Sequence, residues 1–246
     1  TSELLRSYAS NGRYGAAVDI DETKNPRIRL ELNIEVDEGK SAKIESINII
    51  GNELFSNEDL LEGFELSSGS FFSFLSNDNA YSREKLKGDI ESLESFYLNR
   101  GYLKFSIESS QISLSKDKKS IFINFNIFEG EQYTINEVEV IGDLPFEDSV
   151  YEEITDTLKD KIYSQAQITG IEEFFTNVLG NQGYAFAEVS GNPEIDDESQ
   201  MVKLIIQVVP RKRTYTRKIL FTGNNLTQDY VMRREMRQFE GAWSSD

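Results

Sequence analysis

The sequence repeats itself at about the length of a small domain. Three stretches share a pattern of alternating apolar residues that run into a glycine and a short polar step, namely INIIGN, VEVIGD and ILFTGN. Their glycines are Gly51, Gly142 and Gly223, which lie 91 and 81 residues apart. A period of this size predicts tandem copies of one module rather than a single large enzyme core.

A second landmark falls between these openings. An apolar helical pattern ends at a glycine, with a tyrosine one or two residues later, at Gly12, Gly101 and Gly183. These glycines lie 89 and 82 residues apart, so the second landmark has nearly the same period as the first. Two independent landmarks with one period strengthen the prediction of a repeated module.

Composition and charge exclude several classes of function. The 246 residues include 26 Lys and Arg against 43 Asp and Glu, a formal charge of −17, which repels nucleic acid and anionic lipid surfaces. Cysteine and histidine are both absent. This removes disulfides, thiolate nucleophiles, most transition-metal sites and the commonest general base. No apolar run approaches the ~20 residues that span a bilayer.

Acidic pairs are the remaining candidates for chemistry. Asp196-Asp197 and Glu172-Glu173 supply carboxylates, but neither pair has the spacing of a calcium loop or a distinctive glycosidase context. We therefore expect no enzyme activity, no cofactor and no metal site.

Each repeat is predicted to end in a β-hairpin. Strict apolar alternation over residues 28–36 is typical of a half-buried strand, and the same pattern recurs over 121–127 and 202–208. An extended stretch precedes each of these strands across a polar turn, and the three stretches are 18–21, 105–114 and 185–189.

Helical patterns lie between the opening strand and the hairpin. Ser56 and Asp59 form a predicted capping box, and Ser82 precedes an apolar face formed by Leu86, Ile90, Leu93 and Tyr97. The module order is therefore strand, helix, helix, strand, strand. This order predicts an α+β fold with a three-stranded mixed sheet packed on two helices.

The phase of the repeat predicts incomplete modules at both ends. We expect the C-terminal part of a module in residues 1–40, complete modules in 41–131 and 132–213, and the N-terminal part of another in 214–246. These partial modules predict that the sequence belongs to a longer array.

The module order, the I-x-V-x-G-N opening, the Y-x-x-x-G-Y helix end and the E-G strand end together resemble POTRA domains. These are the polypeptide-transport-associated modules of outer-membrane protein insertases. The similarity covers essentially the whole chain, and residues 233–243 are its most specific part because they resemble the last POTRA domain of such an insertase. The resemblance implies the end of a second domain, complete third and fourth domains and the beginning of a fifth.

The resemblance also implies a function. A chain of this family is expected to be a periplasmic scaffold of the β-barrel assembly machinery that guides unfolded outer-membrane proteins by β-augmentation. Its implied partners are lipoproteins of the complex, one a propeller-type scaffold and one a helical-repeat subunit, and its membrane contact would come from a C-terminal barrel outside this sequence. The alternatives are a related autotransporter or two-partner secretion factor, and a periplasmic spacer that binds nothing.

The first candidate site is the strand expected at residues 105–114. An edge strand offers unpaired N–H and C=O groups to an incoming extended segment. The resemblance places strand addition and the propeller-type partner here, with contacts expected at Glu108, Ile112 and Leu114. The alternative is that the apolar side chains pack on the helices or on the next module.

The second candidate site comprises Arg233, Arg237 and Glu240. Spacings of four and three residues predict that they share one face of a helix that begins at about Gln228. The resemblance implies that Glu240 pairs with an arginine of the helical-repeat lipoprotein. The alternative is a solvated helix face, because an exposed ion pair contributes only about 0–1 kcal/mol.

Overall fold

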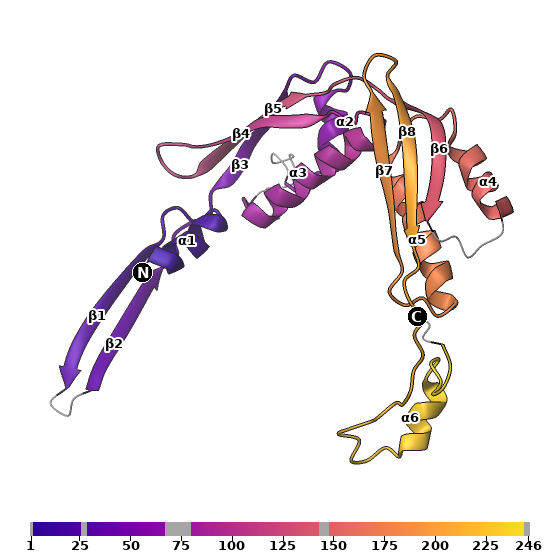
Figure 1. Ribbon diagram of the computed structural model, residues 1–246. Helices are drawn as coiled ribbons and strands as arrows, with labels where there is room; N and C mark the ends of the chain where they lie inside the picture. The colour runs from indigo at the N-terminus through magenta and orange to yellow at the C-terminus, as the bar shows by residue number, and fades with distance from the viewer. Residues whose placement is uncertain (1, 26–28, 67–79, 143–147, 244–246) are drawn as a thin grey trace. The chain divides into compact units, whose positions relative to one another are not determined.

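Alternating apolar residues form the central strand of each three-stranded sheet. In the computed structural model, which describes residues 2–25, 29–66, 80–142 and 148–243, the chain forms two compact units (Figure 1). The first comprises residues 1–98 and 104–130, and the second comprises 99–103 and 131–246. The two units are described separately below.

The first unit begins with α1 (Ser2–Ser10) and an antiparallel hairpin of β1 (Ala17–Asn25) and β2 (Arg29–Asp37). What we call the first module follows. It consists of the elements β3 (Lys43–Ile50), α2 (Asn57–Leu61), α3 (Arg83–Leu98), β4 (Ser106–Leu114) and β5 (Ser120–Phe128). Its strand order is β3-β5-β4, with β3 parallel and β4 antiparallel to β5, so β4 lies at an edge of the sheet.

The second unit contains what we call the second module. It consists of β6 (Thr134–Gly142), α4 (Asp148–Leu158), α5 (Gln165–Asn181), β7 (Glu188–Asp196) and β8 (Met201–Val209). The order β6-β8-β7 reproduces the first sheet, so β7 is the edge strand equivalent to β4. The helix α6 (Asp229–Glu235) follows.

These elements confirm the predicted α+β module and its order of strand, helix, helix, strand, strand. The alternation on the central strands arises because one face of each sheet covers the core: Ile121, Ile123 and Phe125 are fully buried on β5. The predicted capping box is present, since Ser56 and Asp59 cap α2 reciprocally.

Two predicted boundaries are wrong. The extended stretch expected at 185–189 is β7, which begins at Glu188 and continues to Asp196 through Gly191 and Pro193. Glycine and proline lower strand propensity, and they hide this strand from sequence reasoning. The helix expected from Gln228 through Glu240 ends at Glu235, because Met236 adopts an extended conformation.

Each helix-end glycine is hydrogen-bonded to the segment that begins the next repeat. The carbonyl oxygen of Gly101 accepts a hydrogen bond from the backbone N–H of Tyr133 at 2.9 Å. The corresponding carbonyls of Gly12 and Gly183 accept from Ala42 and Thr214, each at 2.8 Å. Gly101 has φ +91° and abuts Ile162 and the Tyr133 carbonyl, so a side chain at this position would be strained and crowded.

Candidate functional site: an open sheet edge and a charged cluster

β4 presents one exposed edge of the first sheet. Its register pairs Ser110 with Phe125, Ile112 with Ile123 and Leu114 with Ile121. Paired residues share a face of the sheet, so Ile112 and Leu114 lie on the same face as the buried core residues of β5. Both remain partly accessible, with 43% of Ile112 and 38% of Leu114 exposed. The edge therefore combines main-chain groups with apolar side chains.

Glu108 occupies a different kind of position from Ile112 and Leu114. The register passes from Ile107 to Ser109 against consecutive residues of β5, so Glu108 is the extra residue of a β-bulge. Its side chain is exposed. The three predicted contact residues thus belong to one strand, but the bulge separates the carboxylate from the regular part of the edge.

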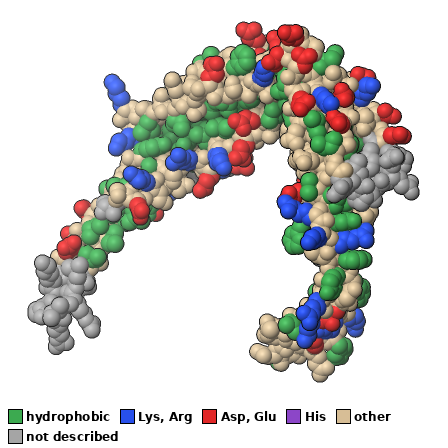
Figure 2. Space-filling model, viewed as in Figure 1, with side chains coloured by type: hydrophobic (Ala, Val, Ile, Leu, Met, Phe, Trp, Pro, Cys, Tyr) green, Lys and Arg blue, Asp and Glu red, His purple; other side chains and the backbone are tan. Residues whose placement is uncertain are grey.

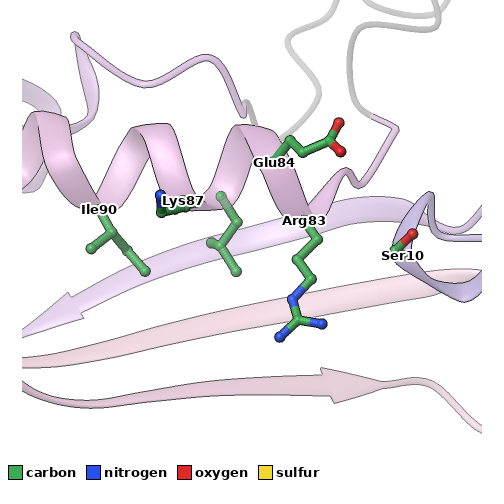
Figure 3. Close-up of a pocket in the computed structure, with 6 residues that line it drawn as sticks. Ser10, Arg83, Glu84, Lys87 and Ile90 are labelled. Atoms are coloured by element: carbon green, nitrogen blue, oxygen red, sulfur yellow. The ribbon is translucent and has the colours of Figure 1, made fainter. Parts of the chain in front are cut away.

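A pocket lies along α3 in the same unit (Figure 3). Its volume is about 410 Å³. Ile90 and Arg83 project from the same side of the helix in Figure 3. The lining consists of Ser10, Arg83, Glu84, Leu86, Lys87 and Ile90.

Sequence reasoning assigned Leu86 and Ile90 to the buried face of this helix. Leu86 is buried, but Ile90 is only half-buried. In Figure 2, hydrophobic side chains form a stripe on the first unit, with Lys and Arg side chains near it. The neighbouring basic residues Arg83 and Lys87, four positions apart, are the signal that this face of the helix meets solvent.

Two buried carboxylates join elements within the first module. Glu129, just after β5, is 7% exposed and accepts hydrogen bonds from the Tyr97 hydroxyl at 2.7 Å and from the N–H groups of Glu53 and Leu54 at 2.9 and 3.1 Å. It therefore joins the end of the hairpin to α3 and to the loop after β3. Sequence reasoning identified Glu129 as part of a strand end and missed this role.

Asp89 of α3 is the second buried carboxylate, and it is fully buried. It accepts hydrogen bonds from the backbone N–H groups of Glu65 and Leu66 at 2.6 and 3.0 Å. Burial raises the pKa of the Asp89 carboxyl above its ordinary value, and these two donors offset part of that rise. Asp89 thus anchors the segment that follows α2.

The second candidate site forms a network within the chain. Arg233 contacts the carboxylate oxygens of Asp229 and Glu240, each at 3.0 Å, and donates to the Ile219 carbonyl oxygen at 2.8 Å. Glu240 also accepts from the Ile219 N–H at 2.8 Å. This N–H, together with Arg233, lowers the pKa of Glu240.

The structure thus brings two of the three predicted residues together, but not on one helix. Arg233 lies in α6, whereas Arg237 and Glu240 follow its end, and Arg237 is exposed. Arg233 and Glu240 meet because the chain folds back after α6. Their shared contact with Ile219 ties this segment to the opening pattern of the last repeat, where the structure has no strand between Thr216 and Phe221.

The described ranges contain no cluster of three or more acidic, His or Cys side chains that could hold a metal ion. Within the same ranges, no helix is both long enough and apolar enough to cross a bilayer.

Comparison with known proteins identifies the repeated module. The model of the POTRA family, described as surface antigen variable number repeat, matches residues 42–130 and 133–211. The outer membrane protein assembly factor BamA of Neisseria meningitidis is 32% identical over 240 residues, which cover 97% of this chain and 30% of that protein. BamA of Buchnera aphidicola is 30% identical, over 99% of this chain and 39% of its own length. The chain therefore spans about a third of the length of these relatives.

A solved structure agrees with the family match. The crystal structure of Haemophilus influenzae BamA POTRA3-5 superposes with a TM-score of 0.70 at 28% sequence identity. The match covers 83% of this chain and 80% of that one.

Proposed function

This chain belongs to the POTRA family, and we propose that it acts as a periplasmic scaffold of the outer-membrane β-barrel assembly machinery, without catalytic chemistry. Support comes from its similarity to BamA proteins over nearly its whole length. In this proposal the chain comprises the end of a second POTRA domain, complete third and fourth domains and the start of a fifth. The match to a POTRA3-5 structure supports that assignment.

The proposed mechanism is strand addition at β4. An incoming extended segment pairs with the main chain of the edge, which tolerates many client sequences, as unfolded outer-membrane proteins require. The exposed apolar side chains of Ile112 and Leu114 add contact area beside the backbone. The observation that carries the proposal is the position of β4 at the edge of its sheet.

The two candidate sites divide the partner lipoproteins between them in this proposal. The propeller-type scaffold binds along β4, where Glu108 on the bulge offers a charge at one end of the edge. The helical-repeat subunit binds near α6 through Arg233, Arg237 and Glu240. Because Arg233 holds Glu240 in place, the pair presents a preformed carboxylate to an incoming arginine.

An NMR titration tests strand addition. A peptide copied from a barrel strand is added to the ¹⁵N-labelled chain, and we expect the largest amide shifts at Ser110, Ile112 and Leu114. Ile112→Pro removes one N–H of the edge and should weaken binding, whereas the matched variant Ile112→Val keeps the N–H and should bind like the parent.

Two results would contradict the proposed mechanism. One is a folded parent chain whose β4 amides do not shift at saturating peptide. The other is binding by Ile112→Pro that equals binding by Ile112→Val. A parallel titration with the helical-repeat lipoprotein should shift amides between Arg233 and Glu240, and Glu240→Ala should reduce those shifts.

A further inference from the structure

The edge of the second sheet is occupied from within the chain. On β7, the backbone N–H of Gly191 donates a hydrogen bond of 2.6 Å to the Glu172 carboxylate of α5. Gly191 is paired in register with Ile206 of β8, but its N–H is directed to Glu172 instead. This N–H therefore belongs to the side of β7 that faces away from β8, where an added strand would have to bind.

A proline removes the next donor on the same side. Successive residues of a strand direct their N–H groups to opposite sides, so residue 193 has the same orientation as Gly191. Residue 193 is proline, which has no N–H. Two consecutive outward donors of β7 are thus unavailable to an incoming strand, one through Glu172 and one through Pro193.

Close packing of α5 against β7 makes the Glu172 contact possible. An added Cβ at Gly191 would collide with the side chain of Ile168, which is fully buried on α5. The absence of a side chain therefore lets the backbone of β7 approach the helix. α5 approaches β7 closely, and in the part of the chain that the structure describes α3 approaches β4 less closely.

The first module differs at each of these positions. When Gly101 is aligned with Gly183, Leu86 of the first module is equivalent to Ile168 of the second, and Ile90 is equivalent to Glu172. By their register against the central strands, Ser110 on β4 is equivalent to Gly191 on β7, and Ile112 is equivalent to Pro193. The side chain of Ile90 has no hydrogen-bond acceptor, and both Ile90 and Leu86 line the pocket along α3. The α3 residues equivalent to those that contact Gly191 in the second module thus line an open pocket in the first.

We propose that Glu172 and Pro193 close the β7 edge to added strands, so that strand addition is directed to β4 rather than to its equivalent in the next module. The inference rests on the proposed strand addition at β4. It assigns a specificity-determining role to two residues outside that site. Gly191 contributes by permitting the approach of α5.

Hydrogen exchange tests the closure without any client. The Gly191 amide of the parent chain should be protected although it faces away from β8. Glu172→Ala should make its exchange about tenfold faster or more, whereas Glu172→Gln, which keeps an acceptor oxygen, should preserve most of the protection. Equal exchange of Gly191 in the parent and in Glu172→Ala would overturn the role of Glu172.

A peptide titration tests the consequence for binding. The parent chain should show peptide-induced shifts on β4 and none on β7. The variant Glu172→Ile/Pro193→Ile imports the residues of the first module, and it should gain shifts on β7 while keeping those on β4. Pro193→Ile alone, with Glu172 still in place, is the matched control and should gain little.

The outcomes separate this inference from the proposed function. Binding to β7 in the parent chain overturns the closure. So does a folded double variant, with β8 amides unchanged, that binds at β4 and gains nothing at β7. If the peptide shifts neither strand in any variant, strand addition at β4 fails, and the hydrogen-exchange comparison alone then decides whether Glu172 closes the edge.

Discussion

The two complete modules share one topology but differ at equivalent positions of their second helix and their edge strand. In the first, Ile90 lines an open pocket and Ser110 carries a side chain on the edge strand. In the second, Gly191 lets β7 lie against α5, and the Glu172 carboxylate accepts a hydrogen bond from the Gly191 N–H. The comparison teaches that a few positions suffice to open or close the edge of an otherwise equivalent sheet.

The modules also differ in what holds them together. The first buries two carboxylates, Asp89 and Glu129, each accepting several hydrogen bonds. The equivalent positions of the second are Ile171 and Pro210. Among its described residues, the buried core is apolar apart from tyrosine hydroxyls, and burial raises the pKa of one of these, Tyr163, to about 12. We therefore expect the first module to be the more sensitive to the loss of a single polar group.

The largest effect is expected from Glu129→Ala. Truncation removes the carboxylate that accepts from the Tyr97 hydroxyl and from two backbone N–H groups, so the free energy of unfolding of the first module should fall by about 3 kcal/mol. Urea unfolding followed by NMR signals of each module would measure it. Glu94→Ala, at an exposed position of α3 in the same module, is the control, and an equal loss in both variants would contradict the role of Glu129.

Gly191→Ala should destabilise the second module by about 2 kcal/mol, because the added methyl group collides with Ile168. The matched change in the first module is Ser110→Ala, at an exposed position, and it should alter stability by less than about 0.5 kcal/mol. Similar losses from the two variants would remove the distinction between the edges.

Asp89→Asn should destabilise the first module by about 1–2 kcal/mol at neutral pH, since the amide cannot accept both hydrogen bonds as the carboxylate does. The pKa of Asp89 is raised in the folded state, so protonation of this group favours folding. The contribution of Asp89 to the free energy of unfolding therefore increases as the pH falls through the raised pKa toward about 4. It decreases again as the pH rises.

The stability gap between the parent chain and Asp89→Asn should accordingly widen on acidification. Urea unfolding of both proteins between pH 7 and pH 4 would measure this gap. A gap that narrows would show that Asp89 is held mainly as a hydrogen-bonded anion.

The smallest effect concerns Glu240, whose pKa is lowered in the folded chain by the Ile219 N–H and by Arg233. Its stabilising contribution is present above the unfolded pKa of about 4.3 and is lost as the pH falls through the lower folded pKa. The Ile219 amide signal should follow this titration in the parent chain and should not do so in Glu240→Gln. A midpoint above 4.3 would contradict the network.

Much of the fold could be predicted because it depends on local patterns. The alternation over 121–127 and the helical spacing from Leu86 to Tyr97 predicted the central strand and the second helix of the first module. The end of α6 could not be predicted in this way. The spacing of charges beyond Glu235 is also compatible with a helix. In the structure the chain instead turns back after α6, where Arg233 and Glu240 both contact Ile219.

The candidate sites were predictable to a lesser degree. The order of strands in the repeat identified residues 105–114 as an edge, but neither the bulge at Glu108 nor the pocket beside Ile90 follows from spacing. Both depend on how two backbone segments meet. For the same reason, the extended stretch predicted at 185–189 stops short of Gly191 and Pro193, which belong to β7.

The sequence by itself determined the repeated module, its element order and the absence of the residues that most catalytic and metal sites need. These follow from periodicity and composition, which are local properties of the chain. Only the tertiary structure decided which edge is open, since Glu172 and Gly191 belong to different elements. Whether a carboxylate reaches the neighbouring strand depends on the distance between packed backbones, and a single missing Cβ sets that distance.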